Sequence, residues 1–201
     1  MKTYRDHYFL KAKRERYPAR SVYKLKEIDA RFHIFRKGMR VLDLGAAPGS
    51  WSLGAAAKVG AEGFVLGLDI QDTETSFPDN VRFCREDVFA RSPECELLLR
   101  ETGPFHVVLS DMAPGTTGHR STDQARSAAL CEEALALALA SLIKGGSFVV
   151  KIFMGPDVPA YAGLLRRHFS AVKSFKPLSS RSESMETFYI ARGFKGIISG
   201  R

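Results

Sequence analysis

Short apolar runs alternate with longer amphipathic stretches along most of the chain. The runs FVLGL, HVVLS and SFVV are continuously hydrophobic, which is typical of strands buried on both faces of a parallel sheet. The stretches between them place apolar residues three or four positions apart, which predicts helices. Helices are expected over residues 1–17, 19–32, 51–59, 121–143 and 156–169, and strands over residues 40–44, 64–69, 80–84, 105–110, 147–152, 171–175 and 187–191.

This order of elements predicts an α/β fold with a seven-stranded, mostly parallel sheet. Right-handed crossovers would place helices on both faces of that sheet. The last two strands follow each other without a helix, so we expect an antiparallel pair at one edge. In open sheets of this kind the ligand crevice lies outside the carboxyl ends of the strands, so those ends are where chemistry is expected.

A turn rich in small residues follows the first strand, in the segment DLGAAPGSW from Asp43 to Trp51. Gly45 and Gly49 allow the backbone to come close to a ligand, because they have no side chain. The spacing is not that of the GxGxxG motif, since Ala47 stands at its second glycine position. This difference argues against a nicotinamide oxidoreductase, which shares this kind of sheet.

A carboxylate follows each of the next two strands, Asp69 after the second and Asp87 after the third. Either residue alone would most simply be a helix cap or a solvated loop residue. At these strand ends, however, one carboxylate can accept hydrogen bonds from ribose hydroxyls and the other from an adenine amino group. Together with the small-residue turn, they predict a nucleoside-binding site.

Four further charged residues are expected to meet in the same crevice. Asp111 lies just after the fourth strand, and Lys151 ends the fifth, where a lysine after a buried run is unusual. Glu186, with Glu183 three residues before it, opens the last strand. Because that strand runs antiparallel, its start lies at the same edge, and Lys24 from the preceding helix can reach over it.

Positive charge is concentrated in the first fifth of the chain. Residues 1–40 contain 13 Lys and Arg against 4 Asp and Glu, whereas the remainder is close to neutral. Tyrosines and a phenylalanine are interleaved with these cations, a pattern typical of nucleic-acid binding. The predicted RNA-binding residues are Arg5, Lys11, Lys13, Arg14, Arg16, Arg20 and Lys24.

Other classes of protein are less compatible with the sequence. Cys84, Cys95 and Cys131 are scattered and show no metal-ligand spacing, so no metal site is expected and a reducing cytoplasm is favoured. No apolar run is long enough for a transmembrane helix, so no membrane association is expected.

The sequence resembles the FtsJ/RrmJ family of ribose 2′-O-methyltransferases over nearly the whole chain, from about Asp6 to Gly193. The resemblance rests on five segments that together are highly specific. They are ARSVYKL from Ala19, DLGAAPG from Asp43, SDMAP from Ser110, GGSFVVK from Gly145 and KPLSSR from Lys176.

The resemblance implies the Rossmann-like fold of S-adenosylmethionine-dependent methyltransferases, with S-adenosylhomocysteine as a product. The family's Lys-Asp-Lys-Glu tetrad matches Lys24, Asp111, Lys151 and Glu186. Its cofactor contacts, together with the residues of the first turn, give the predicted cofactor site: Asp43, Gly45, Gly49, Trp51, Asp69, Asp87 and Asp111.

The same resemblance suggests a mechanism. A ribose hydroxyl is a poor nucleophile, so it must be held in line with the methyl group and lose its proton. We expect Lys151 to remove this proton or to position the hydroxyl, with Asp111 orienting the lysine. Lys24 and Glu186 would fix the lysine and the ribose.

Three parts of the chain are expected: a basic RNA-binding extension over residues 1–36, a methyltransferase domain over 37–194 and a tail over 195–201. The favoured substrate is a uridine in large-subunit ribosomal RNA, bound by a cytoplasmic monomer that does not bind DNA. The segment Tyr8–Lys13 also resembles the enzymes that modify transfer RNA, so that substrate stays open. A non-catalytic ribosome-assembly factor and a small-molecule methyltransferase are the remaining alternatives.

Overall fold

The computed structural model describes residues 2–181 and 183–196, with side chains from residue 7 onward. It contains six helices and seven strands within those residues. The helices are α1 (Lys2–Arg14), α2 (Val22–Phe32), α3 (Ser50–Val59), α4 (Pro93–Thr102), α5 (Arg120–Ser141) and α6 (Val158–His168). The strands are β1 (Arg40–Leu44), β2 (Phe64–Asp69), β3 (Val81–Arg85), β4 (Phe105–Ser110), β5 (Leu142–Phe153), β6 (Phe169–Phe175) and β7 (Glu186–Phe194).

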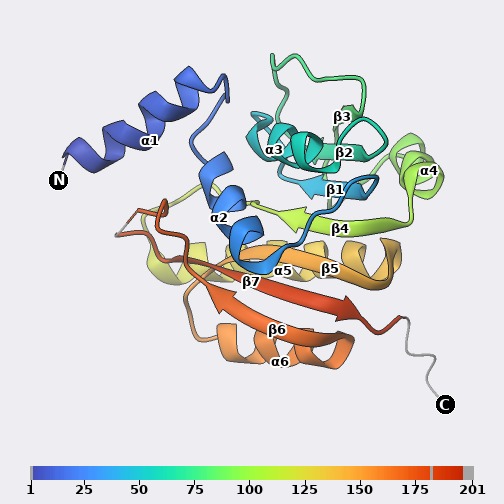
Figure 1. Ribbon diagram of the computed structural model, residues 1–201. Helices are drawn as coiled ribbons and strands as arrows, with labels where there is room; N and C mark the ends of the chain where they lie inside the picture. Colours follow the sequence, from blue (N-terminus) through green and yellow to red (C-terminus); the bar gives the residue numbers. More distant parts are fainter. Residues whose placement is uncertain (1, 182, 197–201) are drawn as a thin grey trace.

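All seven strands form one sheet in the order β3-β2-β1-β4-β5-β7-β6 (Figure 1). The neighbours from β3 to β5 are parallel, and β7 is antiparallel to both β5 and β6. The predicted mostly parallel sheet with an antiparallel pair at one edge is therefore confirmed, with β6 as the outermost strand. Strands β1 and β4 are parallel neighbours, and the order in which successive strands are added to the sheet reverses between them, which places the expected ligand crevice at the ends of these two strands.

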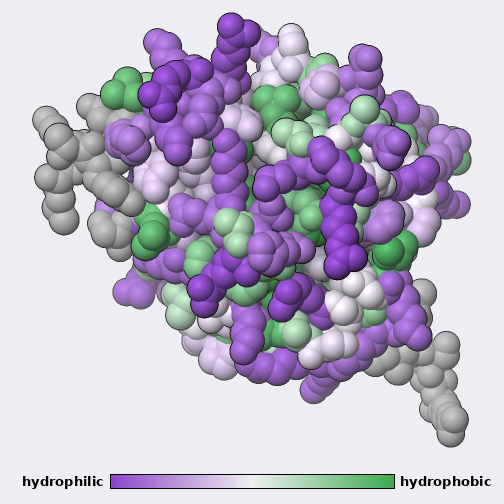
Figure 2. Space-filling view, viewed as in Figure 1, coloured by the Kyte–Doolittle hydropathy of each residue, from purple (hydrophilic) through white to green (hydrophobic). Residues whose placement is uncertain are grey.

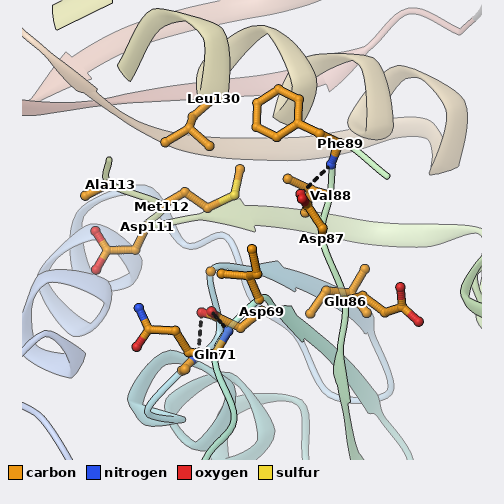
Figure 3. A pocket seen from close by; sticks show the side chains of 14 residues that line it. Asp69, Gln71, Glu86, Asp87, Val88, Phe89, Asp111, Met112, Ala113 and Leu130 are labelled. Carbon is orange, nitrogen blue, oxygen red and sulfur yellow. Dashed lines mark hydrogen bonds between the residues drawn. The ribbon is translucent and has the colours of Figure 1, made fainter. Parts of the chain in front are cut away.

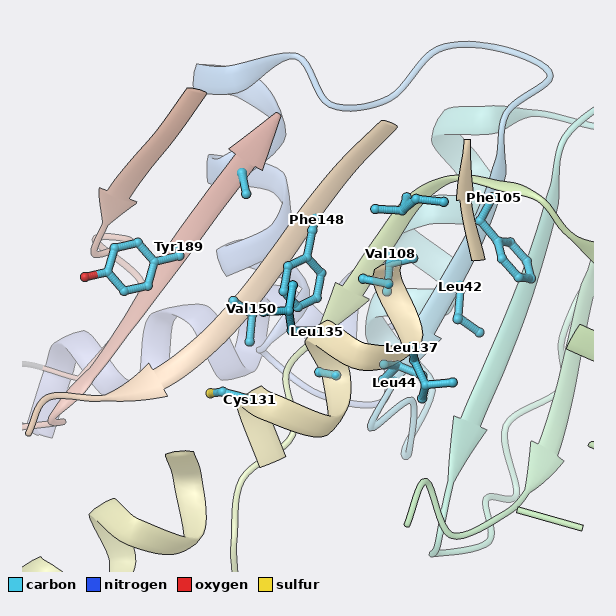
Figure 4. Close-up of a cluster of buried hydrophobic side chains, with 14 of the residues drawn as sticks. Leu42, Leu44, Phe105, Val108, Cys131, Leu135, Leu137, Phe148, Val150 and Tyr189 are labelled. Atoms are coloured by element: carbon cyan, nitrogen blue, oxygen red, sulfur yellow. The ribbon is translucent and has the colours of Figure 1, made fainter. Parts of the chain in front are cut away.

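Each face of the sheet is covered by its own helices. Residues of α4, α5 and α6 pack with one face into the larger hydrophobic core, part of which is drawn in Figure 4. Residues of α2 and α3, among them Leu25, Ile28 and Trp51, pack with the other face. The continuously apolar strands are therefore buried on both sides, as their sequences predict.

Two local features differ from the sequence prediction. Helix α4 was not predicted, although Ser92 caps it by accepting a hydrogen bond from the backbone N–H of Cys95. Strand β5 begins at Leu142, five residues before the predicted start at Ser147. The register with β4 shifts in between, and Gly145 has a φ of 86°. Gly145 and Gly146 therefore lie in an irregularity within β5 and do not separate β5 from α5.

Helix α1 lies outside both large cores and projects from one end of the molecule (Figure 1). It is attached to α2 through a small cluster, in which Ala12 packs with Val22 and Tyr23, and Tyr8 and Tyr17 add partly buried rings. Figure 2 shows that the face carrying α1, α2 and β7 is mainly hydrophilic. Within the described part of the chain, every helix is too short or too polar to span a membrane.

Candidate active site

The first pair of predicted catalytic residues is formed by two neighbouring parallel strands. Asp111 follows the end of β4, and Lys151 lies near the end of β5. The Lys151 Nζ atom is 2.9 Å from Oδ1 of Asp111 and also donates a hydrogen bond to the Asp111 backbone carbonyl. Only 8% of the lysine side chain and 15% of the aspartate side chain are exposed, so this ion pair is largely shielded from water.

The second pair joins α2 to the start of β7. The Lys24 Nζ atom lies 2.6 Å from Oε1 of Glu186. Burial alone would raise the pKa of Glu186, but the charge and hydrogen bond of Lys24 outweigh it, with help from Ser180 and Lys151. The pKa of Glu186 is therefore held below its usual range, and the carboxylate is charged at neutral pH.

The two pairs belong to one site. The charge of Lys151 acts on Glu186, and Lys151 lies opposite Phe188 in the antiparallel register of β5 and β7. The Lys24 ammonium group lies over the Phe188 ring, 5.7 Å from its centroid. All four residues of the predicted tetrad are thus brought together at one edge of the sheet.

The small-residue turn after β1 is held in place by Asp69. One carboxylate oxygen of Asp69 accepts from the N–H of Ala47 at 2.9 Å, and the other accepts from the N–H of Gln71 at 2.8 Å. Gly45 has a φ of 78°, and a Cβ atom there would lie 2.7 Å from Cγ of Met112. Only glycine is free of strain and of this contact at that position.

A pocket of about 330 Å³ opens next to Asp111, at the carboxyl ends of the parallel strands (Figure 3). Its polar wall includes Asp69, Asp87 and Asp111, which come from three segments of the chain. Its lining consists of Gly45, Ala47, Leu68, Asp69, Ile70, Gln71, Glu86, Asp87, Val88, Phe89, Asp111, Met112, Ala113 and Leu130.

The charges of this lining indicate what it can hold. It contains four carboxylates and no Lys, Arg or His. Such a wall would repel a pyrophosphate group but would favour a ligand with positive charge. The carboxylates can also accept hydrogen bonds from hydroxyl and amino groups, while Met112, Val88 and Leu130 offer apolar contacts. The pocket therefore suits a cationic nucleoside and does not suit a dinucleotide.

Three of the predicted cofactor residues do not line this pocket. Asp43 is fully buried and accepts a hydrogen bond from the Ser52 hydroxyl at 2.6 Å. Burial, opposed by the Ser52 hydrogen bond and reinforced by the charges of Asp111 and Asp69, raises the pKa of Asp43 to about 7. Because its hydrogen bond with Ser52 links β1 to α3, Asp43 supports the turn between these two elements and does not line the pocket.

Gly49 and Trp51 also lie outside the lining. Gly49 has a φ of 111° at the start of α3, facing Phe77 and Thr75. The Trp51 ring is buried, stacks on Phe188 and donates a hydrogen bond to the Ser21 carbonyl at 2.9 Å. A role of Gly49 and Trp51 in cofactor binding therefore stays a prediction.

The predicted RNA-binding residues lie on α1, in the turn between α1 and α2, and on α2, where Lys24 pairs with Glu186. Lys13, Arg14 and Arg16 are exposed, while the Lys11 ammonium group lies over the Tyr23 ring, 4.9 Å from its centroid. Arg20 donates a hydrogen bond to the Ser179 carbonyl at 3.0 Å. The side chain of Arg5 lies outside the described residues.

Part of the pocket was not predicted from the sequence. Met112, Phe89, Ile70 and Leu130 supply its apolar wall, and they carry no signal beyond their positions near strand ends or on α5. Among the residues that the structure describes, no group of three or more His, Cys, Asp or Glu side chains is arranged to hold a metal ion.

Comparisons with known proteins identify methyltransferases that are similar to this chain. The family of FtsJ-like methyltransferases matches residues 17–194. The ribosomal RNA large subunit methyltransferase E of Oleidesulfovibrio alaskensis is 73% identical, over 98% of this chain and 95% of that protein. The protein of the same name from Lawsonia intracellularis is 60% identical, over 97% of this chain and 98% of that protein.

Solved structures show the same fold. A Plasmodium falciparum protein described as a ribosomal RNA methyltransferase superposes with a TM-score of 0.79 at 23% identity, covering 90% of this chain and all of that one. The MycE methyltransferase of mycinamycin biosynthesis, solved with S-adenosylhomocysteine, superposes with a TM-score of 0.57 at 16% identity, over 89% of this chain and 49% of that one. From its sequence, this chain belongs to the family of FtsJ-like methyltransferases.

Proposed function

We propose that this protein transfers a methyl group from S-adenosylmethionine to a ribose 2′-hydroxyl of RNA, with a uridine of large-subunit ribosomal RNA as the target. The observation that carries the proposal is the pairing of Lys151 with Asp111, because Asp111 also lines the anionic pocket. Asp111 therefore contacts the amine of Lys151 and also forms part of the proposed cofactor site. The names of the close relatives supply the choice of ribosomal RNA.

The pocket fits the proposed cofactor in charge and in hydrogen-bonding capacity. S-adenosylmethionine supplies an activated methyl group on a positively charged sulfur. We assign its binding to Gly45, Asp69, Asp87 and Asp111, with carboxylates available for its ribose hydroxyls and amino groups. Asp43 and Trp51 would contribute indirectly, by holding the turn and α3 in place.

The chain's own groups would then prepare the nucleophile. A lysine ammonium group has three donor positions. Lys151 donates one hydrogen bond to the carbonyl of Asp111 and forms an ion pair with its carboxylate, so a donor position remains for the ribose oxygen. In its neutral form, the Lys151 amine would accept the hydroxyl proton as the oxygen–carbon bond forms. Lys24 and Glu186 would hold the ribose from the other side.

The substrate is best tested in cells and in isolated RNA. Mapping of 2′-O-methyl groups in a strain that lacks this gene should reveal one missing ribose methylation in large-subunit ribosomal RNA. Incubation of that RNA with the purified protein and S-adenosylmethionine should restore it. Loss of a methyl group from transfer RNA instead would identify the other substrate class, and no missing methyl group in any RNA would support a non-catalytic assembly factor.

The basic extension is proposed to bring the RNA to this site, in the cytoplasm and within a large ribosomal subunit, with the protein acting as a monomer. Conversion of the exposed residues Lys13, Arg14 and Arg16 to Gln should weaken RNA binding about 10²-fold at physiological salt. The reason is that each lost phosphate contact lowers the slope of log affinity against log salt by about 0.7–0.9. Filter binding of ribosomal RNA over a range of salt concentrations measures both quantities.

The triple substitution tests RNA binding more specifically than deletion of α1 does, because deletion also removes the packing of Tyr8 and Ala12 on α2. The matched control converts three exposed bases elsewhere, Arg100, Lys144 and Lys173, to Gln. This control should bind RNA normally, and both variants should bind S-adenosylmethionine normally. Equal RNA affinities for the two triple variants would exclude this docking surface.

A further inference from the structure

A second pocket, of about 360 Å³, is lined in part by the Lys24–Glu186 pair. The turn before α2, α2 itself, the segment between β6 and β7, and the start of β7 all contribute to it. Since Lys24 and Glu186 line it, this pocket adjoins the tetrad but shares no residue with the proposed cofactor pocket. The lining residues are Arg20, Ser21, Lys24, Arg181, Glu183, Ser184 and Glu186.

The wall formed by the segment between β6 and β7 is fixed to α2. The Glu27 carboxylate accepts hydrogen bonds from the N–H groups of Leu178 at 2.6 Å and Ser179 at 3.0 Å. Arg20 donates to the Ser179 carbonyl at 3.0 Å, and Lys176 donates to the Ser184 carbonyl at 2.8 Å. These contacts hold the pocket open before any substrate arrives, which lowers the ordering cost of binding.

The charges in this pocket differ from those of the cofactor pocket. It has three basic and two acidic side chains, and one of the acids, Glu186, is neutralised by its contact with Lys24. Arg181 is exposed, and among the residues that the structure describes no carboxylate pairs with its guanidinium group. A guanidinium group without a carboxylate partner is well suited to bind a phosphate through two parallel hydrogen bonds.

We propose that this pocket receives the nucleotide to be methylated and that Arg181, together with Arg20, binds a phosphate next to it. The inference rests on the proposed RNA methyltransferase function and adds the place of the substrate. The target ribose would then lie between two walls. One carries Arg181 and Arg20, which hold the backbone, and the other carries Lys24 and Glu186, which face the reacting centre. The phosphate contact would orient the 2′-hydroxyl toward Lys151.

Arg181→Gln tests this proposal, with Arg100→Gln as the matched control. Arg100 is also exposed, but it lies on α4, whose C-terminal end contacts Arg40 at the opposite edge of the sheet. We expect Arg181→Gln to raise the KM for large-subunit ribosomal RNA about tenfold and to lower the salt slope of RNA binding by about 0.7–0.9. The affinity for S-adenosylmethionine, measured by calorimetry, should stay within about twofold of wild type.

Arg181→Lys separates charge from geometry. It should recover the salt slope but not the full KM, because lysine cannot form the two parallel hydrogen bonds. If Arg181→Gln binds and methylates RNA as Arg100→Gln does, the proposal is overturned. The RNA-binding measurement does not require methyl transfer. A wild-type protein that binds RNA through Arg181 but methylates none would therefore contradict the proposed function and leave the pocket standing.

Discussion

Replacement of Lys151 by Ala is expected to lower kcat for methyl transfer by about 10²–10⁴-fold, the range typical of a lost general base. The amine of Lys151 is the group proposed to hold the 2′-hydroxyl and take its proton, and its contacts with Asp111 fix it in that position. The affinity for S-adenosylmethionine should change little, since Lys151 does not line the cofactor pocket. Single-turnover transfer of a labelled methyl group at saturating RNA measures the effect.

Removal of the amine also leaves Asp111 with an unpaired, largely shielded charge, and that can destabilise the fold. Lys151→Met is the second variant, because it keeps most of the apolar stem while removing the amine. The control is Lys144→Ala, an exposed lysine at the other end of β5. Near-normal turnover of folded Lys151→Met that still binds the cofactor would show that Lys151 is not the base.

Replacement of Asp69 by Ala is expected to weaken S-adenosylmethionine binding by about 10–100-fold. Hydrogen bonds to a charged group are worth about 1.5–3 kcal/mol each. Asp69 accepts from the N–H groups of Ala47 and Gln71, and all three residues line the pocket. The substitution therefore loosens the turn and removes an acceptor for the ligand. Calorimetric titration with S-adenosylmethionine gives the change in Kd.

The control for this prediction is Asp72→Ala. Asp72 is exposed in the same loop, its carboxylate accepts from the N–H of Thr73 at 2.8 Å, and it does not line the pocket. Methyl transfer by Asp69→Ala should approach the wild-type rate at high cofactor concentration, because the tetrad is intact. An unchanged Kd would mean that Asp69 neither supports the turn nor contacts the ligand.

Much of the fold could be predicted because strands that are buried on both faces require continuous apolar runs, which can be recognised in the sequence. The predicted bounds of β1, β2 and β4 agree with the structure, since these strands are mainly apolar on both faces and end at a polar residue or, in β1, directly before the glycine of the following turn. Helix α4 was missed although the sequence Ser92-Pro93-Glu94 carries a helix-start signal, because only three of its residues, Cys95, Leu98 and Leu99, form its buried apolar face. The start of β5 was missed because a sequence does not show that glycines can lie inside an irregular strand.

The charged residues of the site were predictable for a related reason. Asp69, Asp111 and Lys151 follow from their positions at strand ends, and the sheet brings strand ends together. The sequence could not show that the Trp51 ring stacks on Phe188, because its position on the first turn of α3 does not reveal which way the ring points. The link between Glu27 and the segment before β7 joins residues about 150 positions apart, and no local pattern signals it.

The modest attachment of α1 has a consequence for the stability of different parts of the molecule. Among the side chains described from residue 7 onward, its packing on α2 involves one small cluster, whereas the sheet is enclosed by two large cores. Local opening therefore costs much less free energy in α1 than in the central strands. In native-state hydrogen exchange, the amides of α1 should exchange long before those of β1 and β4, and bound RNA should slow exchange in α1 far more than in the sheet.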